Sequence, residues 1–344
     1  MKIRLACLSV LMGLCFSSGV LAQTPVKMSL DFRFDGPGAG FLLALDKGYY
    51  KAEGLDVTID PGNGSVEGIN RVASGAYDIA VADINSLIRY RDTAENPPIK
   101  AIFMIGNAPA FAVTSLKKTG IAKPKDLEGK TVGAPAADGA YANWAAFMKA
   151  SGTDSSKIRI ENVGFAVREQ MLAQGKVDAI VGFGYTAAVS MQAAGFKPEE
   201  VSIMYMRNYG LDMYGNALVA GPAFLRDKPD VARKFIRASI KGYLEAMTDP
   251  QSAIASVIKR NPVTTAEAET MRFRIFQNEN FLTAEVKANG IGAVDPARFN
   301  RAIDQIGESF KYKAKPKMDD VYTESFLPPL ADRKVPAALV NKAH

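Results

Sequence analysis

Apolar and polar positions follow the same pattern in two places along the chain. Residues 73–81 read ASGAYDIAV, and residues 173–181 read AQGKVDAIV. In each segment the end of an apolar helical stripe meets a glycine, which favours the left-handed conformation that ends helices, and a buried strand follows. The pattern therefore predicts two copies of one supersecondary unit.

The flanks of the two segments also match in the elements they predict. In the first copy a strand over Val26–Phe34 leads through a glycine-rich turn into a helix, and a second strand covers Asp56–Asp60. In the second copy the strand Thr131–Val132 leads to a helix capped by Asp138, and a second strand covers Lys157–Val163. Each copy is then a strand-helix-strand-helix-strand unit, which buries a mostly parallel sheet between helices.

Further apolar stretches predict strands that connect the two units. A strand pair, Ile99–Ile105 and Ala110–Leu116, lies between the copies. Two more stretches, Val201–Met206 and Tyr214–Ala220, run back after the second copy. We therefore expect the chain to pass from one lobe to the other and to return.

The predicted crossings divide the chain into two lobes of an α/β fold. We expect the hinges near Gly106-Asn107 and Ala220-Gly221. The remainder of the chain is mostly helical and has no counterpart in the second copy, so we expect it to complete the first lobe. This interpretation gives a discontinuous first lobe, residues 23–108 and 219–344, and a second lobe, residues 109–218.

The first 22 residues are typical of an export signal. Lys2 and Arg4 precede an apolar stretch, Leu5–Val20, and small residues then lead up to a cleavage site after Ala22. A retained membrane anchor is the alternative, but spanning a bilayer takes roughly 20 apolar residues. We therefore expect the mature protein to be located in the periplasm, with residues 1–22 removed as a signal peptide.

Composition limits the chemistry that the mature chain can perform. Both cysteines, Cys7 and Cys15, lie in the segment to be removed, and the only histidine is His344 at the end of the chain. Disulfides, thiolate metal sites and cysteine nucleophiles are therefore excluded, and we expect no cofactor and no metal, because neither nucleotide-binding nor metal-ligand spacings occur. Without Lys2 and Arg4 the formal net charge of +6 falls to +4. These charges are spread singly, so nothing indicates nucleic-acid binding.

Two α/β lobes joined by crossing strands favour binding over catalysis. Ligands of open parallel sheets lie beyond the carboxyl ends of the strands, where loops lead into helix N-termini. Two such lobes face one cleft, and closure about the crossings buries a ligand from both sides. The helix N-termini offer free N–H groups and partial positive charge, which suit anionic ligands.

Several motifs resemble the solute-binding proteins of nitrate/taurine-type ABC importers. The run FDGPGAGFLLALDKGYYKAEGLDV at 34–57 resembles the opening of that family. GNGS at 62–65, ASGAYDI at 73–79 and GKTVG at 129–133 are similar to its next motifs. The resemblance implies a type II periplasmic binding protein that acts as a monomer and passes a small molecule to a permease with a cytoplasmic ATPase.

The resemblance leaves several ligand classes open. Members of the family bind alkanesulfonates, taurine, nitrate, or heterocycles such as thiamin pyrimidine precursors and riboflavin. The pyrimidine binders usually open with Asp-Trp and carry an Asn-Thr-x-His loop, whereas this chain reads DFRF at 31–34 and has no histidine there. Aromatic residues in the predicted loops favour a flat ring, and Arg33 with the helix N-termini favours an anion. We therefore expect an aromatic or heterocyclic organic anion, or a sulfonate-like one.

The candidate ligand-binding residues all lie in the predicted loops at the strand ends or along the returning crossing. Many are residue types that turns and helix caps also need, so capping remains an alternative role. Arg33 suits an oxyanion, but it faces away from the cleft if Leu30, Phe32 and Phe34 share one strand face. The candidates are Arg33, Phe34, Asp35, Asn63, Ser65, Asp83, Asn85, Asp138, Tyr141, Phe183, Tyr185 and Tyr214.

Two other functions remain open. The fold also supports enzymes of pyrimidine or menaquinone synthesis, but the fungal pyrimidine synthase that this chain distantly resembles needs a cysteine-rich motif and a histidine. Neither is present in the mature chain apart from His344. The other alternative is a sensory module that presents its ligand to a receptor, which would use the same cleft.

Overall fold

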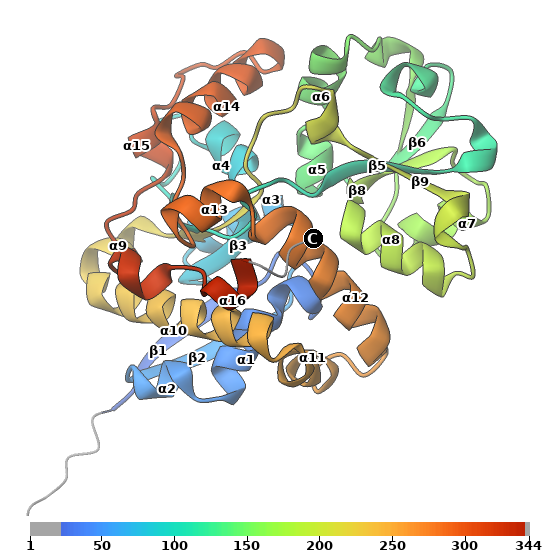
Figure 1. Cartoon of the computed structure of the whole chain (residues 1–344). Helices are drawn as coiled ribbons and strands as arrows, with labels where there is room; N and C mark the ends of the chain where they lie inside the picture. The colour runs from blue at the N-terminus through green and yellow to red at the C-terminus, as the bar shows by residue number, and fades with distance from the viewer. Residues whose placement is uncertain (1–21, 341–344) are drawn as a thin grey trace, which may run out of the picture.

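The computed structural model describes residues 22–340 of the chain. The predicted signal peptide lies outside the described residues except for Ala22, and so do both cysteines and His344. Within 22–340 no helix is both long enough and apolar enough to cross a membrane. The described residues fold into two α/β lobes, which lie beside each other in Figure 1.

A five-stranded sheet forms the centre of the first lobe. The middle strand of this sheet, Ile79–Asp83, is buried along its whole length, whereas the edge strand Leu55–Asp60 alternates between buried and more exposed residues. Four strands run parallel and β10 runs against both its neighbours. In spatial order the strands are β2 (Leu55–Asp60), β1 (Thr24–Ser29), β3 (Ile79–Asp83), β10 (Asn216–Ala220) and β4 (Lys100–Met104).

The second lobe repeats this plan. One strand, β5, again runs against its two neighbours, and the other pairings are parallel. In spatial order the strands are β7 (Arg159–Asn162), β6 (Thr131–Ala134), β8 (Ala179–Phe183), β5 (Phe111–Leu116) and β9 (Val201–Tyr205). The predicted α/β fold with two mostly parallel sheets is confirmed.

The repeated sequence segments build the same local structure in both lobes. Gly75 and Gly175 have φ angles of 74° and 69°, so each ends its helix in the left-handed conformation. Three residues later, a carboxylate accepts a hydrogen bond from the first strand of its own copy of the repeated unit, β1 or β6. The distance is 2.8 Å from Lys27 N to Asp78 and 2.8 Å from Thr131 N to Asp178.

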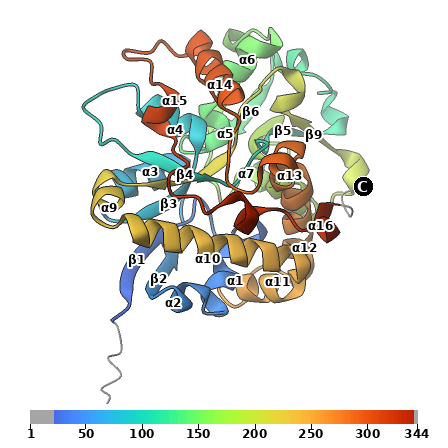
Figure 2. The same ribbon diagram turned by 60° about the vertical axis from the view of Figure 1, so that its left-hand side comes forward.

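Helices cover both faces of the two sheets. In the first lobe they include α1 (Ala39–Asp46), α2 (Tyr49–Ala52), α3 (Ser65–Ala73), α4 (Ile84–Tyr90), α9 (Pro222–Asp227), α10 (Pro229–Thr248) and α11 (Pro250–Ile258). The long helix α10 packs against α1 and α11 (Figure 2). In the second lobe they include α5 (Gly139–Ala142), α6 (Trp144–Ser151), α7 (Arg168–Ala173) and α8 (Gly184–Ala193).

The C-terminal helices contact both lobes, although we expected them to complete only the first. They are α12 (Ala266–Phe276), α13 (Ala284–Asn289), α14 (Pro296–Ser309), α15 (Met318–Val321) and α16 (Ala337–Val340). Helix α12 packs against α8, and α14 packs against α6. A short π-helix, Gln277–Phe281, follows α12 directly.

Two crossings join the lobes, one at residues 105–110 and one at residues 206–215. They run beside each other, because Gly215 N donates to Gly106 O over 2.7 Å and Gly106 N donates to Asn216 O over 2.8 Å. The first crossing contains the hinge predicted at Gly106-Asn107. The second hinge prediction is wrong, because Ala220 pairs with Ile79 and Lys100 inside the first sheet.

The first strand ends earlier than its apolar pattern predicts. Strand β1 stops at Ser29, and residues 31–34 form an irregular loop that leads into a short 3-10 turn, Gly36–Gly38. The expected alternation of side chains between two sheet faces therefore does not apply to this loop. As a result, both Phe32 and Arg33 line the space between the lobes.

Candidate functional site

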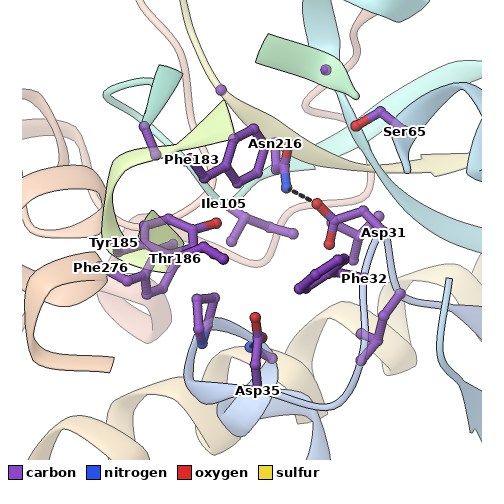
Figure 3. Close-up of a pocket in the computed structure, with 18 of the residues that line it drawn as sticks. Asp31, Phe32, Asp35, Ser65, Ile105, Phe183, Tyr185, Thr186, Asn216 and Phe276 are labelled. Carbon is purple, nitrogen blue, oxygen red and sulfur yellow. Dashed lines mark hydrogen bonds between the residues drawn. The ribbon is translucent and has the colours of Figure 1, made fainter. Parts of the chain in front are cut away.

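A cavity lies between the two lobes, at the carboxyl ends of the parallel strands. Its volume is about 850 Å³, including open solvent at its mouth. Figure 3 shows its wall, to which loops of both lobes, the crossings and the C-terminal helices contribute. This is the location at which open α/β sheets bind ligands.

The first lobe contributes two carboxylates to the wall, those of Asp31 and Asp35. Asp31 is half-buried and accepts a hydrogen bond of 2.5 Å from the amide nitrogen of Asn216 (Figure 3). Desolvation raises the pKa of Asp31 to about 6, although the Asn216 bond opposes the shift. Both oxygens of this carboxylate are acceptors when it is ionised, so it suits a ligand that carries N–H or O–H groups.

Asp35 lies next to Asp31 along the same loop. It is 6% exposed and caps the 3-10 turn, with 3.4 Å between Gly38 N and Asp35 Oδ1. Burial raises the pKa of Asp35 to about 7; Arg272 opposes this shift and Glu269 adds to it. Glu269 and Arg272 form a buried ion pair behind the loop, so their charges largely cancel.

The second lobe neutralises its own carboxylate. Asp138 caps α5 through the N–H groups of Ala140 and Tyr141, and Arg168 Nη1 donates to its other oxygen over 2.8 Å. The guanidinium has room because residue 182 is glycine: a Cβ there would lie 2.5 Å from Arg168 Nη1. Arg168 also pairs with Glu169, so this cation is already engaged.

Aromatic rings form the apolar part of the cavity. Phe183 is the last residue of β8 and Tyr185 lies in the first turn of α8; their ring centroids are 5.6 Å apart, and Tyr185 lies edge-on to Phe276 at 6.0 Å (Figure 3). Phe32 of the first lobe reaches Phe165 of the second, with ring centroids 5.6 Å apart. These rings can stack on a flat ligand, and the last pair brings the two lobes into contact.

The lobes also meet through buried polar groups. Asn143 of the second lobe donates to Asp83 Oδ2 over 3.2 Å and accepts from Arg89 Nη2 over 3.3 Å. Gly139 permits this approach, because a Cβ there would lie 2.9 Å from Ser65 Oγ and 2.8 Å from Asp83 Cβ. The structure is therefore a closed arrangement of the two lobes.

Half of the twelve candidate residues line the cavity. They come from the loop after β1, the start of α3, the loop after β6 and the segment after β8, as the strand-end argument predicts. Arg33 is exposed and its guanidinium lies 4.9 Å from the ring of Phe32. The lining candidates are Arg33, Asp35, Ser65, Asp138, Phe183 and Tyr185.

Three of the other candidates have structural roles that keep them away from the cavity. Asp83 caps α4, and Asn85 donates both to Asp83 Oδ1 and to the carbonyl of Tyr214. Tyr214 is fully buried and its hydroxyl donates to Glu285 over 2.6 Å. Asp83 thus has the capping role that was the alternative to ligand contact, and hydrogen bonding and burial use the side chains of Asn85 and Tyr214, neither of which lines the cavity.

The remaining three candidates also lie off the cavity wall. The side chain of Phe34 packs into the core of the first lobe, since the loop turns after β1 ends. Asn63 is exposed beside the turn that starts α3, and Tyr141 packs on the apolar face of the second lobe. The structure therefore does not support placing them at the cleft.

Several residues that line the cavity were not among the candidates. Asp31 was missed because the strand was expected to run to Phe34. Phe276 and Asn280 come from the helical remainder, where no motif or repeat marks a functional position. Phe32, Phe165, Arg168 and Thr186 are further examples, and Asn216, a weaker candidate because it flanks the returning crossing, also lines the cavity. Of the acidic and basic side chains on the wall, three are acidic and two are basic, and Arg168 is already paired.

Proteins with related sequences bind or make heterocycles. The chain is 23% identical to a riboflavin-binding protein of Chloroflexus aurantiacus, covering 84% of this chain and 82% of that one. It is 26% identical to a formylaminopyrimidine-binding protein of Halalkalibacterium halodurans, covering 68% and 69%. It is also 26% identical to a 4-amino-5-hydroxymethyl-2-methylpyrimidine phosphate synthase of Aspergillus parasiticus, covering 65% and 67%.

Solved structures have the same fold. The periplasmic aliphatic sulphonate-binding protein of Escherichia coli superimposes with a TM-score of 0.66 at 12% identity, covering 86% of this chain and 96% of that one. At this identity the likeness concerns the fold alone. Residues 38–253, more than half of the chain, match the family described as NMT1/THI5 like. The resemblance predicted from the sequence motifs is thereby confirmed: the chain belongs to the NMT1/THI5-like family and has the two-lobed fold of the periplasmic binding proteins.

Proposed function

We propose that this protein is the periplasmic substrate-binding component of an ABC importer and is not an enzyme. It captures a small heterocyclic solute between its lobes, closes about the two crossings, and delivers the solute to a permease that a cytoplasmic ATPase drives. The observation that carries the proposal is the cavity at the strand ends of both lobes, lined by aromatic rings and carboxylates. The export motif of residues 1–22 supports the location.

The cavity wall favours a neutral or cationic ligand that carries N–H or O–H donors over the organic anion that the sequence predicts. An anion would face Asp31 and Asp35, and the two neighbouring cations are a solvent-exposed arginine and the paired Arg168. N–H donors on a flat ring pair with carboxylates at its edge, while Phe183 and Tyr185 contact its face. The names of the riboflavin- and formylaminopyrimidine-binding relatives agree with this class.

The fungal synthase among the relatives supports a second candidate, an enzyme acting on a pyrimidine. Carboxyl groups with a raised pKa, such as those of Asp31 and Asp35, are suited to general acid–base catalysis. Such groups also occur wherever a carboxylate lies in a closed binding cleft. No described residue on the cavity wall is a cysteine or histidine, the residue types that the resemblance links to the synthase.

Calorimetric titration of the mature protein tests the ligand class. We expect formylaminopyrimidine or riboflavin to bind and to raise the melting temperature by several degrees at saturation, whereas taurine and nitrate leave it unchanged. Asp31→Asn removes a charged acceptor from the cavity, so we expect its affinity to fall about tenfold or more. Asn63→Ala, at an exposed position off the cavity wall, is the matched control and keeps the wild-type affinity.

Three outcomes would overturn parts of the proposal. Binding of sulfonates or nitrate in place of the heterocycles would reject the ligand class. Equal affinity of Asp31→Asn and wild type would reject the role of this carboxylate. Chemical conversion of the bound heterocycle, detected by mass spectrometry, would make the enzyme the better interpretation.

A further inference from the structure

The hydroxyl group of Tyr185 has no hydrogen-bond partner among the described residues, although the side chain is only 5% exposed. In the part of the chain that the structure describes, the other buried tyrosines all bond through their hydroxyls to another residue: these are Tyr50, Tyr214, Tyr243 and Tyr322. A buried tyrosine hydroxyl usually has a partner, so the unpaired one needs an explanation.

This hydroxyl faces open space inside the molecule. Within residues 22–340, four side-chain nitrogen or oxygen atoms are both covered by protein and unpaired, and the hydroxyl oxygen of Tyr185 is not one of them. An unpaired atom outside that set keeps accessible surface, and Tyr185 lines the cavity. Figure 3 shows its hydroxyl pointing from the wall of the second lobe toward the interior of the cavity. A group bound in the cavity can therefore reach it.

The next residue presents a second hydroxyl. Thr186 lines the cavity and is 4% exposed, and its hydroxyl also has no partner among the described residues without being one of the covered atoms. Both residues lie in the first turn of α8, which no side chain caps, whereas Asp83 caps α4 at the corresponding point of the first lobe. The partial positive charge at a helix N-terminus favours a hydrogen-bond acceptor close to it.

The surroundings keep the Tyr185 hydroxyl protonated. Burial raises its pKa well above the usual value, and the carboxyls of Asp31 and Asp35 raise it further, while Arg272 opposes the shift. A protonated phenol donates one hydrogen bond. The two carboxyls belong to the first lobe and the hydroxyl to the second, so acceptors and donor lie on opposite walls of the cavity.

We propose that the hydroxyls of Tyr185 and Thr186 form a donor subsite that binds a carbonyl oxygen or a ring nitrogen of the ligand. The inference rests on the proposed function and narrows its ligand class. Asp31 and Asp35 accept from N–H or O–H groups at one edge of a flat ring, and this subsite donates to an acceptor at another edge. The preferred solute is then a neutral heterocycle that carries both donors and acceptors, and not a cation that carries donors alone.

Calorimetric titration of Tyr185→Phe with riboflavin and with formylaminopyrimidine tests the subsite. The variant keeps the ring and removes only the hydroxyl, so we expect its affinity for the probe that wild type binds more tightly to fall about fivefold or more. Thr186→Val keeps the shape of the side chain and should lower the affinity about twofold or more; wild-type affinity in this variant would make the assignment of Thr186 wrong. Without ligand, Tyr185→Phe should melt at or above the wild-type temperature, because no hydrogen bond within the protein is lost.

A matched control removes a hydroxyl that is bonded inside the protein. Tyr50 is 1% exposed, does not line the cavity, and its hydroxyl lies 2.9 Å from Ser239 Oγ. We expect Tyr50→Phe to lower the melting temperature by about 2–4 °C and to keep the wild-type affinity for both probes. The two tyrosine variants should therefore show opposite behaviour, one in affinity and the other in stability.

The outcomes distinguish this inference from the proposed function. If wild type binds a probe and Tyr185→Phe binds it equally well, the donor subsite is wrong and the proposed function stands. If Tyr185→Phe without ligand loses as much stability as Tyr50→Phe does, the hydroxyl has a structural role and the inference is wrong. If wild type binds neither probe, the ligand class of the proposed function fails, and the subsite fails with it.

Discussion

The two lobes share a scaffold but differ at the ends of their strands. In both, a left-handed glycine and a carboxylate follow a helix, and Asp78 and Asp178 accept from the first strand of their lobe at the same distance. The strand that follows each carboxylate then ends differently. Asp83 caps the next helix in the first lobe, whereas Phe183 occupies the corresponding position in the second and presents a ring to the cavity.

The carboxylates that face the cavity differ in the same way. Among residues 22–340, no side-chain ion pair involves Asp31 or Asp35 of the first lobe, and desolvation raises the pKa of both. Asp138 in the second lobe has a buried arginine at 2.8 Å; burial raises the pKa of this carboxyl as well, and Arg168 opposes the shift. The repeat thus specifies the sheet and its helices, while the residues beyond the repeat make one wall an acceptor surface and the other an aromatic and charge-balanced one.

Removing the buried arginine of the second lobe has the largest expected effect on the free energy of unfolding. Arg168→Met leaves Asp138 and Glu169 without their buried partner, so we expect a loss of about 3–5 kcal/mol in the free energy of unfolding. The measurement is urea denaturation, with hydrogen exchange to locate the loss in β6 and β8. Adding Asp138→Asn should recover part of the loss, and a loss below about 1 kcal/mol would contradict a structural role for this pair.

Asp78 and Asp178, the carboxylates at the same position of the two repeated segments, test whether the lobes are equivalent. We expect Asp78→Ala and Asp178→Ala each to lower the free energy of unfolding by about 1–3 kcal/mol, because each leaves one strand N–H without its acceptor. Both aspartates are half-buried, but the Lys27–Asp78 bond is more exposed than the Thr131–Asp178 bond, so the first loss should be the smaller one and the two should agree to within about 1 kcal/mol. Hydrogen exchange would show each loss in its own lobe, and strongly unequal losses would contradict the equivalence.

Much of the fold could be predicted because its signals are local and repeated. A helix stripe, a glycine and a buried strand within nine residues specify the same geometry wherever they occur, and Gly75 and Gly175 have almost the same φ. Loops at strand ends follow from that plan, which is why Asp35, Ser65 and Phe183, all expected near strand ends, line one cavity.

The rest of the site depends on long-range packing that no local pattern carries. Where β1 ends is decided by its neighbours: β1 pairs along its whole length with β2, which ends at Asp60, and Leu30 is already beyond the strand. Asn280 reaches the cavity only through its bonds to Ala108, a contact between residues 172 positions apart. Asn85 and Tyr214 were plausible cleft residues, but Asn85 donates to Asp83 and to the carbonyl of Tyr214, and the side chain of Tyr214 is buried against Glu285.

The smallest expected effect is the pH dependence of stability that the raised pKa of Asp35 gives to the first lobe. The pKa of Asp35 is raised to about 7 by burial, so the folded protein keeps a proton that the unfolded chain has released above about pH 4. Stability therefore falls as pH rises from about 4 to about 7, and this cost is absent below pH 4, where both states are protonated. Asp35→Asn removes the ionising group while an asparagine can still cap the 3-10 turn.

We expect Asp35→Asn to be more stable than wild type by about 1–2 kcal/mol at pH 8 and to match it at pH 4. Thermal unfolding across this range measures the difference, with Asp56→Asn, an exposed carboxylate on β2, as the control that follows wild type throughout. Because a ligand that donates to Asp35 favours its ionised form, binding should release a proton near pH 7 and tighten as pH rises. If neither the stability of the protein nor its affinity for ligand changed between pH 5 and pH 8, Asp35 would not be a buried carboxyl with a raised pKa on the first-lobe wall.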